Sequence, residues 1–216
     1  MTELQGVIGF EGIGINAWMV WVLPFIGAAL IPAIAKARNR VRNYAAVGFA
    51  LASAISAATL LPLGIEGGHV HSQINWIPIL NIQAGTLADS LSITMTNIVA
   101  WISFLIFVYS VGYMHGDKNL TRYWFFMLFF IGSMQLIVLS DNLLMVFFGW
   151  EGVGLASFAL IGFWYHDRKK DFVGTPGHYA GGIQMWASPS HAGLKAFLMT
   201  KAGDIMMLSG MFLIFA

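Results

Sequence analysis

The chain has 216 residues, of which 58% are hydrophobic and only 10% are charged, and its mean hydropathy is +0.74. Such a composition is typical of a multi-span membrane protein and excludes an ordinary soluble domain. The net charge of +1 gives no indication of nucleic-acid binding, and the sequence contains no cysteine. Disulfides, cysteine-bound zinc and iron–sulfur clusters ligated by this sequence are therefore excluded.

Two membrane spans are predicted in the first third of the chain, at residues 17–35 and 44–63. The stretch before them lacks the positively charged start of a signal peptide, so we interpret it as mature sequence. Pro24 and Pro32 fall inside the first span, where a membrane helix tolerates them. After the second span, the connection at residues 64–84 contains the apolar run WIPILNI. Its partial alternation predicts a strand or hairpin lying over the membrane surface.

Four further spans are predicted at residues 91–113, 123–139, 143–165 and 191–216. The long polar stretch before the last span contains Gly and Pro residues that exclude a continuous helix. Ser188 and Pro189 then predict the N-cap and first turn of the sixth span. The predicted fold class is an all-α integral membrane protein with six transmembrane helices in a single membrane domain.

Basic residues outside the spans are confined to one side of the predicted membrane. Of the eleven Lys and Arg residues, Lys195 and Lys201 lie inside the sixth span, and the remaining nine follow the first, third and fifth spans. The opposite connections contain acidic residues but no basic ones. The positive-inside rule therefore predicts a multi-pass cell-membrane protein whose N-terminus is outside. The six His residues lie in connections or at span ends, which argues against a haem inside the membrane.

A carboxylate lies in the middle of the fifth span. Counting about 1.5 Å per residue, Glu151 lies roughly 14 Å into a hydrocarbon core of about 30 Å. A charge at this depth costs on the order of 3 kcal/mol, so Glu151 is expected to face protein or water and to have a partner. Gly149, Gly152 and Gly154 leave room for another backbone beside this helix. The role is either functional or that of a structural polar clamp between helices.

The sixth span contains three ionisable residues. Lys201 and Asp204 are three residues apart and share a helix face, so they can pair. Because neighbouring spans enter from opposite sides, Glu151 and Lys201 reach comparable depths. Charges of both signs at membrane depth predict a proton relay or charge switch, with a static buried ion pair as the structural alternative. Lys195 is close enough to the cytoplasmic end to extend its side chain to the interface.

Two stretches carry a family resemblance: SDNLLMVFFGWEGVGLASFALIGFWY and HAGLKAFLMTKAGDIMMLSGMFLI. They closely resemble the fifth and sixth membrane helices of the antiporter-like L chains of respiratory complex I, the proton-pumping NADH:quinone oxidoreductase. LADSLSITM and YSVGYMHGD resemble the same family, which is similar to the large subunits of multisubunit sodium/proton antiporters. By this resemblance Glu151 matches the proton-path glutamate. Lys201 stands where many members have arginine, Asp204 matches an aspartate of the family, and Lys195 matches the lysine of its KAF element.

The resemblance implies a proton-translocating membrane subunit of a redox-driven oxidoreductase that uses NADH. The pattern VGTPGH…SPSHAG within residues 173–190 is similar to archaeal coenzyme F420-dependent dehydrogenases, which implies a prokaryotic protein and F420H2 as another donor. No cofactor or metal is expected in this chain, and other membrane subunits would bind the quinone-like acceptor. Two alternatives stay open: a subunit of a multisubunit sodium/proton antiporter, and a structural membrane subunit with a static ion pair.

Members of this family are more than twice as long and place a key lysine on a broken seventh helix. The sequence is therefore expected to be the N-terminal portion of an antiporter-like subunit, either as a fragment or as a split gene product. The first four spans contain no acidic or basic side chain between their predicted ends. We therefore expect that this chain does not pump protons alone.

Overall fold

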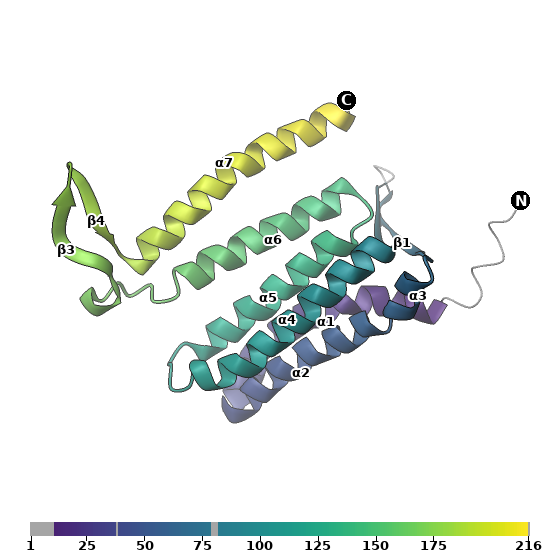
Figure 1. Cartoon of the computed structure of the whole chain (residues 1–216), viewed down its shortest axis with the longest axis horizontal. Helices are drawn as coiled ribbons and strands as arrows, with labels where there is room; N and C mark the ends of the chain where they lie inside the picture. Colours follow the sequence, from purple (N-terminus) through teal and green to yellow (C-terminus); the bar gives the residue numbers. More distant parts are fainter. Residues whose placement is uncertain (1–10, 38, 79–81, 216) are drawn as a thin grey trace, which may run out of the picture. The chain divides into compact units, whose positions relative to one another are not determined.

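The computed structural model describes residues 11–37, 39–78 and 82–215, and the chain forms two compact units, Met1–Gly152 and Val153–Ala216. Figure 1 shows the elements in chain order. In the first unit these are α1 (Glu11–Ala37), α2 (Asn39–Ala58), α3 (Leu61–Ile65), β1 (Val70–Ile77), β2 (Ile82–Ala88), α4 (Ser90–Tyr113) and α5 (Leu120–Leu139). Helix α6 (Leu143–Ile161) runs from the first unit into the second, which continues with β3 (Val173–Ala180), β4 (Ile183–Ala187) and α7 (Pro189–Phe215).

Within the described residues, six helical segments are long and apolar enough to cross a membrane. Five of them are α1, α4, α5, α6 and α7, and the sixth is formed by α2 and α3 jointly. The shortest has 19 residues, a length of about 28 Å at 1.5 Å per residue. The predicted fold class of six membrane helices is thus confirmed. Strands occur in two of the connections.

Several helix boundaries differ from the prediction, and α1, for example, begins at Glu11 rather than near residue 17. Helix α2 begins at Asn39 rather than near residue 44, which places Arg42 within the helix, where it is buried. Arg42 donates hydrogen bonds to Thr121 Oγ1 (3.0 Å) and to the Asn43 side chain (3.1 Å), so the buried guanidinium group is stabilised by neutral polar partners. Helix α6 ends at Ile161 instead of residue 165. The prediction placed the end too late because Phe163, Trp164 and Tyr165 follow without a charged residue to mark the boundary.

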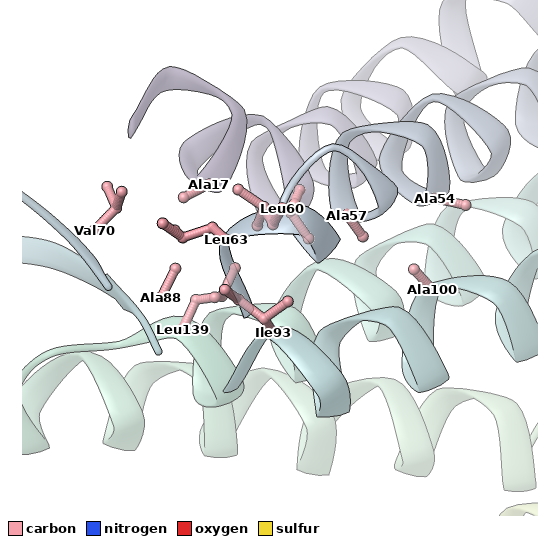
Figure 2. Close-up of a cluster of buried hydrophobic side chains, with 11 residues drawn as sticks. Ala17, Ala54, Ala57, Leu60, Leu63, Val70, Ala88, Ile93, Ala100 and Leu139 are labelled. Atoms are coloured by element: carbon pink, nitrogen blue, oxygen red, sulfur yellow. The ribbon is translucent and has the colours of Figure 1, made fainter. Parts of the chain in front are cut away.

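The core of the first unit contains many alanines among its larger apolar side chains. Helix α1 packs against α2 and α5, and α2 packs against α4. Figure 2 shows Ala17, Ala54, Ala57 and Ala100 where these helices approach one another, with Leu60 among them. Alanine at such contacts lets helix backbones come close, which is how membrane helices gain packing energy in lipid.

The connection after α3 is a β-hairpin, as the alternation in the sequence predicted. Strands β1 and β2 pair antiparallel, with Val70 opposite Ala88 and Asn75 opposite Gln83. The hairpin is attached to the turn between α5 and α6. Thr86 forms an isolated bridge with Ser140, and the Asp141 amide donates to the Gly85 carbonyl over 3.3 Å.

The second unit contains another hairpin, which the sequence did not predict. Strands β3 and β4 pair antiparallel and are joined by Gly181 and Gly182, whose φ angles are +58° and +81°. Two consecutive positive φ angles are what a two-residue type I′ hairpin turn requires, and glycine adopts them without strain. Near this hairpin, the start of α7 lies against the end of α6. A Cβ on Gly193 would lie 3.0 Å from the backbone nitrogen of Gly162.

Candidate functional site

The predicted pair on α7 is formed. Lys201 Nζ lies 2.9 Å from Asp204 Oδ2, and the Asp204 side chain is only 7% exposed. The ammonium group also lies 5.0 Å from the centre of the Phe197 ring, within the range of a cation–π contact. On α6, a Cβ on Gly154 would lie 3.7 Å from Lys201 Nζ, so glycine leaves the lysine unobstructed on this side. The lysine therefore stabilises a buried carboxylate inside a predicted membrane span.

The beginning of α7 is capped by residues on both sides of the hairpin. The Ser188 hydroxyl accepts the His191 amide over 3.3 Å, as predicted for an N-cap. The Asp167 carboxylate accepts the Ser190 amide over 3.1 Å and also the Ser190 hydroxyl. These hydrogen bonds lower the pKa of Asp167 below its ordinary value. The capping therefore ties the first turn of α7 to the connection that precedes it.

Glu151 is half-buried, on a stretch of α6 in which Gly149 and Gly152 face α5. A Cβ on Gly149 would lie 2.9 Å from the Ser133 carbonyl oxygen and 3.1 Å from the Ile137 amide nitrogen, and one on Gly152 would overlap the Ser133 hydroxyl. The predicted close approach of a second backbone is therefore confirmed for Gly149, whereas Gly152 makes room for a side chain. Glu151 belongs to the first unit and Lys201 to the second, and their coupling stays a prediction.

Lys195 lies apart from the Lys201–Asp204 pair. Six residues separate it from Lys201, which is about 9 Å along a helix. Its side chain is exposed and lines a cavity of about 500 Å³ together with His191 and Trp186. Its predicted place near the end of the span agrees with its position in the second turn of α7.

A buried polar cluster in the first unit was not identified from the sequence. The Gln135 amide donates to the Thr96 carbonyl over 3.0 Å, and the Asn97 amide donates to the Ala57 carbonyl over 2.9 Å. In the described part of the chain, Thr96 Oγ1, Asn97 Oδ1 and Gln135 Oε1 are buried without a hydrogen-bond partner. Buried oxygens of this kind commonly bind internal water. The amide side chains of Asn97 and Gln135 within apolar spans could have indicated this cluster. They were overlooked because the sequence was searched for charged residues.

A second polar cluster surrounds Asp141, at the end of the first hairpin. Its carboxylate accepts hydrogen bonds from His71 Nε2 (2.9 Å), Gln73 Nε2 (2.7 Å) and Asn142 Nδ2 (2.7 Å). Burial alone would raise the pKa of Asp141, but these three donors and the nearby imidazole outweigh it, and the pKa is lowered. A Cβ on Gly85 would overlap the carboxylate, so only glycine fits there.

The described residues contain no group of three or more His, Asp or Glu side chains that could hold a metal ion. The predicted absence of a cofactor remains an expectation.

Comparison with known proteins identifies the relatives of this chain. Residues 76–124 match the family model described as NADH-Ubiquinone oxidoreductase (complex I), chain 5 N-terminus. NADH-quinone oxidoreductase subunit L of Mycobacterium tuberculosis (strain H37Rv) is 34% identical over 206 residues, covering 92% of this chain and 30% of the relative. The subunit L of Escherichia coli (strain K12) is 33% identical over 201 residues, covering 90% of this chain and 30% of the relative.

Two solved structures share the fold. A chain of the Mrp complex from Dietzia sp. DQ12-45-1b superposes with a TM-score of 0.66 at 22% identity, over 89% of this chain and 18% of that one. A chain of the archaeal membrane-bound sulfane sulfur reductase superposes with a TM-score of 0.69 at 14% identity, over 90% of this chain and 36% of that one. The chain spans about 30% of the length of the curated relatives above. Over that part, its sequence is similar to NADH-quinone oxidoreductase subunit L.

Proposed function

We propose that this chain is a proton-translocating membrane subunit of a redox-driven, quinone-type oxidoreductase, in which it moves protons and other subunits transfer electrons. The observation that carries the proposal is the Lys201–Asp204 ion pair, with N–O distance 2.9 Å, inside a helix that can span the membrane. The homology to subunit L supports the assignment to the NADH-quinone oxidoreductase family. The sequence pattern in residues 173–190 favours F420H2 as a second candidate donor.

The pair can act as a proton switch because a charge inside a membrane is stable only while an opposite charge is near. With Lys201 in contact, Asp204 remains a carboxylate. If the ammonium group moves away, the carboxylate is left in a medium of low dielectric and binds a proton, which it releases when the lysine returns. The long lysine side chain allows such a movement, and Gly154 does not block it.

Glu151 is proposed as a second member of the relay, and Lys195 as a group near the cytoplasmic end of the path. The reason for Glu151 is its depth near the middle of α6, where an acidic residue without a function would only destabilise the helix. This chain covers only about 30% of the length of its relatives. We expect both roles to depend also on residues of the part that it does not cover. The protein is expected to work in the cell membrane with its N-terminus outside, in contact with other membrane subunits.

The test uses the assembled complex in inverted membrane vesicles, with Glu151→Gln and Asp204→Asn as variants and Lys201→Arg as the matched control. Electron transfer is measured together with proton uptake reported by a pH-sensitive dye. Each carboxylate variant should reduce proton uptake per electron by at least about fivefold, the typical size of a coupling between sites. The control Lys201→Arg should keep most of the proton uptake per electron, because arginine keeps the positive charge. Subunit content is measured by gel in the same membranes.

The outcomes separate the alternatives. If Glu151→Gln and Asp204→Asn abolish assembly and pumping together, the static ion pair becomes the better explanation. A subunit of a sodium/proton antiporter has a structural counterpart in the Mrp complex, whose chain shares the fold. That function would give proton movement driven by a sodium gradient in the absence of any electron donor.

A further inference from the structure

A cavity of about 500 Å³ lies wholly within the second unit, between strand β4 and the first half of α7. Its lining combines basic, aromatic and apolar side chains: Gln184, Trp186, His191, Lys195, Ala196 and Met199. The volume is within the range of sites that hold small molecules. The proton relay proposed above uses the Lys201–Asp204 pair, which does not line this cavity.

The polarity of the cavity falls along the axis of α7. His191, Lys195 and Met199 are spaced by four residues and therefore share one helix face. At 1.5 Å per residue, Lys195 lies about 6 Å and Met199 about 12 Å beyond His191. The helix that is long and apolar enough to span a membrane begins at Pro189, so we place the His191 end of the cavity at the membrane boundary and the Met199 end deeper. A ligand that fills it must be anionic at one end and apolar at the other.

The basic groups at the boundary are available to a ligand. Within the described part of the chain, neither the His191 ring nor Lys195 Nζ makes a hydrogen bond or ion pair with a protein group. The acidic residue in electrostatic reach of His191 is Asp167, and its carboxylate is already bound to the amide and hydroxyl of Ser190. On the same connection, the basic residues Arg168, Lys169 and Lys170 outnumber the acidic residues Asp167 and Asp171. The local charge therefore suits a phosphate group.

The hairpin that forms the other wall is amphipathic. Tyr179 pairs with Gln184 across the strands, and its ring lies 4.9 Å from that of Trp186 in an edge-on contact, so these side chains share one face. The alternate residues Ile183 and Met185 are 69% and 49% exposed on the opposite face. Tryptophan and tyrosine favour the headgroup level of a bilayer, and apolar side chains next to them favour its acyl boundary.

We propose that this cavity binds one anionic phospholipid. Its phosphate contacts His191 and Lys195, its glycerol region lies against Trp186, and an acyl chain follows Ala196 and Met199 into the membrane. A lipid is favoured over free phosphate because the inner half of the cavity offers only apolar contacts. It is favoured over a protein segment because basic groups at one end and apolar side chains at the other match a phosphate headgroup and an acyl chain.

The proposal is tested by native mass spectrometry on the purified complex after delipidation, with phosphatidylglycerol or phosphatidylcholine added back. The variants are Trp186→Ala and His191→Gln. The control is His178→Gln, which changes a histidine of the same hairpin that does not line the cavity. We expect one tightly held phosphatidylglycerol in the parent protein and in the control. Its affinity should be lower by roughly tenfold in His191→Gln, as for the loss of one charge-assisted hydrogen bond.

Three results would overturn the proposal. One is equal retention of phosphatidylglycerol and phosphatidylcholine, and another is unchanged retention in both variants. The third is displacement of the lipid by millimolar inorganic phosphate, which would indicate an anion site without lipid specificity. A photo-crosslinking amino acid at Trp186 provides an independent measurement in intact membranes. It should capture lipid, and capture of another subunit instead would show that protein fills the cavity.

Discussion

His71 Nε2 on strand β1 lies 2.9 Å from Oδ2 of Asp141, in the turn between α5 and α6. The carboxylate side chain is 5% exposed and the imidazole 44% exposed, so the buried acid is held by a partner that water still reaches. Gln73 donates to the same oxygen over 2.7 Å. The hairpin β1–β2 is therefore attached to the end of α5 by side chains as well as by its backbone.

The first prediction concerns pH. The pKa of Asp141 is lowered in the folded protein, so the carboxylate contributes stability that is present above its unfolded pKa of about 3.9. This contribution is lost as the pH falls through the still lower folded pKa. Thermal unfolding of the purified chain should therefore show a larger difference between the parent and Asp141→Asn at pH 6 than at pH 3. A difference that stays constant over this range would contradict the assigned role.

The second prediction concerns the contact between α6 and α7. Alanine at Gly193 would place its Cβ 3.0 Å from the Gly162 nitrogen and from the Phe158 carbonyl oxygen, both of them backbone atoms. The helices must separate, and we expect a loss of about 1–3 kcal/mol in the free energy of unfolding. Gly203 on the same helix is the matched control, because a Cβ there meets nothing within 4 Å. Gly203→Ala should be neutral or stabilising by up to about 1 kcal/mol.

These two variants are compared by thermal denaturation in the same detergent. Equal effects of Gly193→Ala and Gly203→Ala would mean that the close approach of Gly193 to Gly162 does not exist in solution.

The third prediction concerns topology. The sequence contains no cysteine, so single cysteines give a clean signal. Glu66, Lys118 and Lys169 are all exposed and lie in three different connections. In intact cells, a membrane-impermeant thiol reagent should label a cysteine that replaces Glu66. Cysteines that replace Lys118 or Lys169 should be labelled only after the membrane is made permeable. Labelling of the Lys169 position from outside would overturn the predicted orientation.

The fourth prediction is that the chain alone does not conduct protons. The stretch of α6 between Asp141 and Glu151 contains Leu143, Met145 and Phe148, with no group that relays a proton. Asp141 itself is occupied by three donors. Liposomes containing only this chain should dissipate an imposed pH gradient no faster than protein-free liposomes and should not respond to a sodium gradient. Saturable proton flux that disappears in Glu151→Gln would show that six helices are sufficient.

The sequence was informative wherever the signal was local. Helix count follows from hydropathy, the Lys201–Asp204 pair from a spacing of three residues, and the first hairpin from alternation. The contacts that were missed join distant residues: His71 and Asp141 are 70 positions apart, and Gly162 meets Gly193 across the second hairpin. No pattern along the chain encodes such distances. The neutral cluster of Thr96, Asn97 and Gln135 was missed because amide side chains shift hydropathy too little to interrupt a span.

The link between Asp141 and the first hairpin has a consequence for biosynthesis. Asp141 is translated 68 residues after Gln73, its hydrogen-bond donor. At roughly 5–20 residues per second, the ribosome needs about 3–14 s to add that length. A hairpin closes in about 1–10 μs, so strands β1 and β2 pair long before their anchor exists. The nascent hairpin must wait on its side of the bilayer until α5 has been inserted, and Asp141 then supplies the contacts to His71 and Gln73 that hold the hairpin to the end of α5.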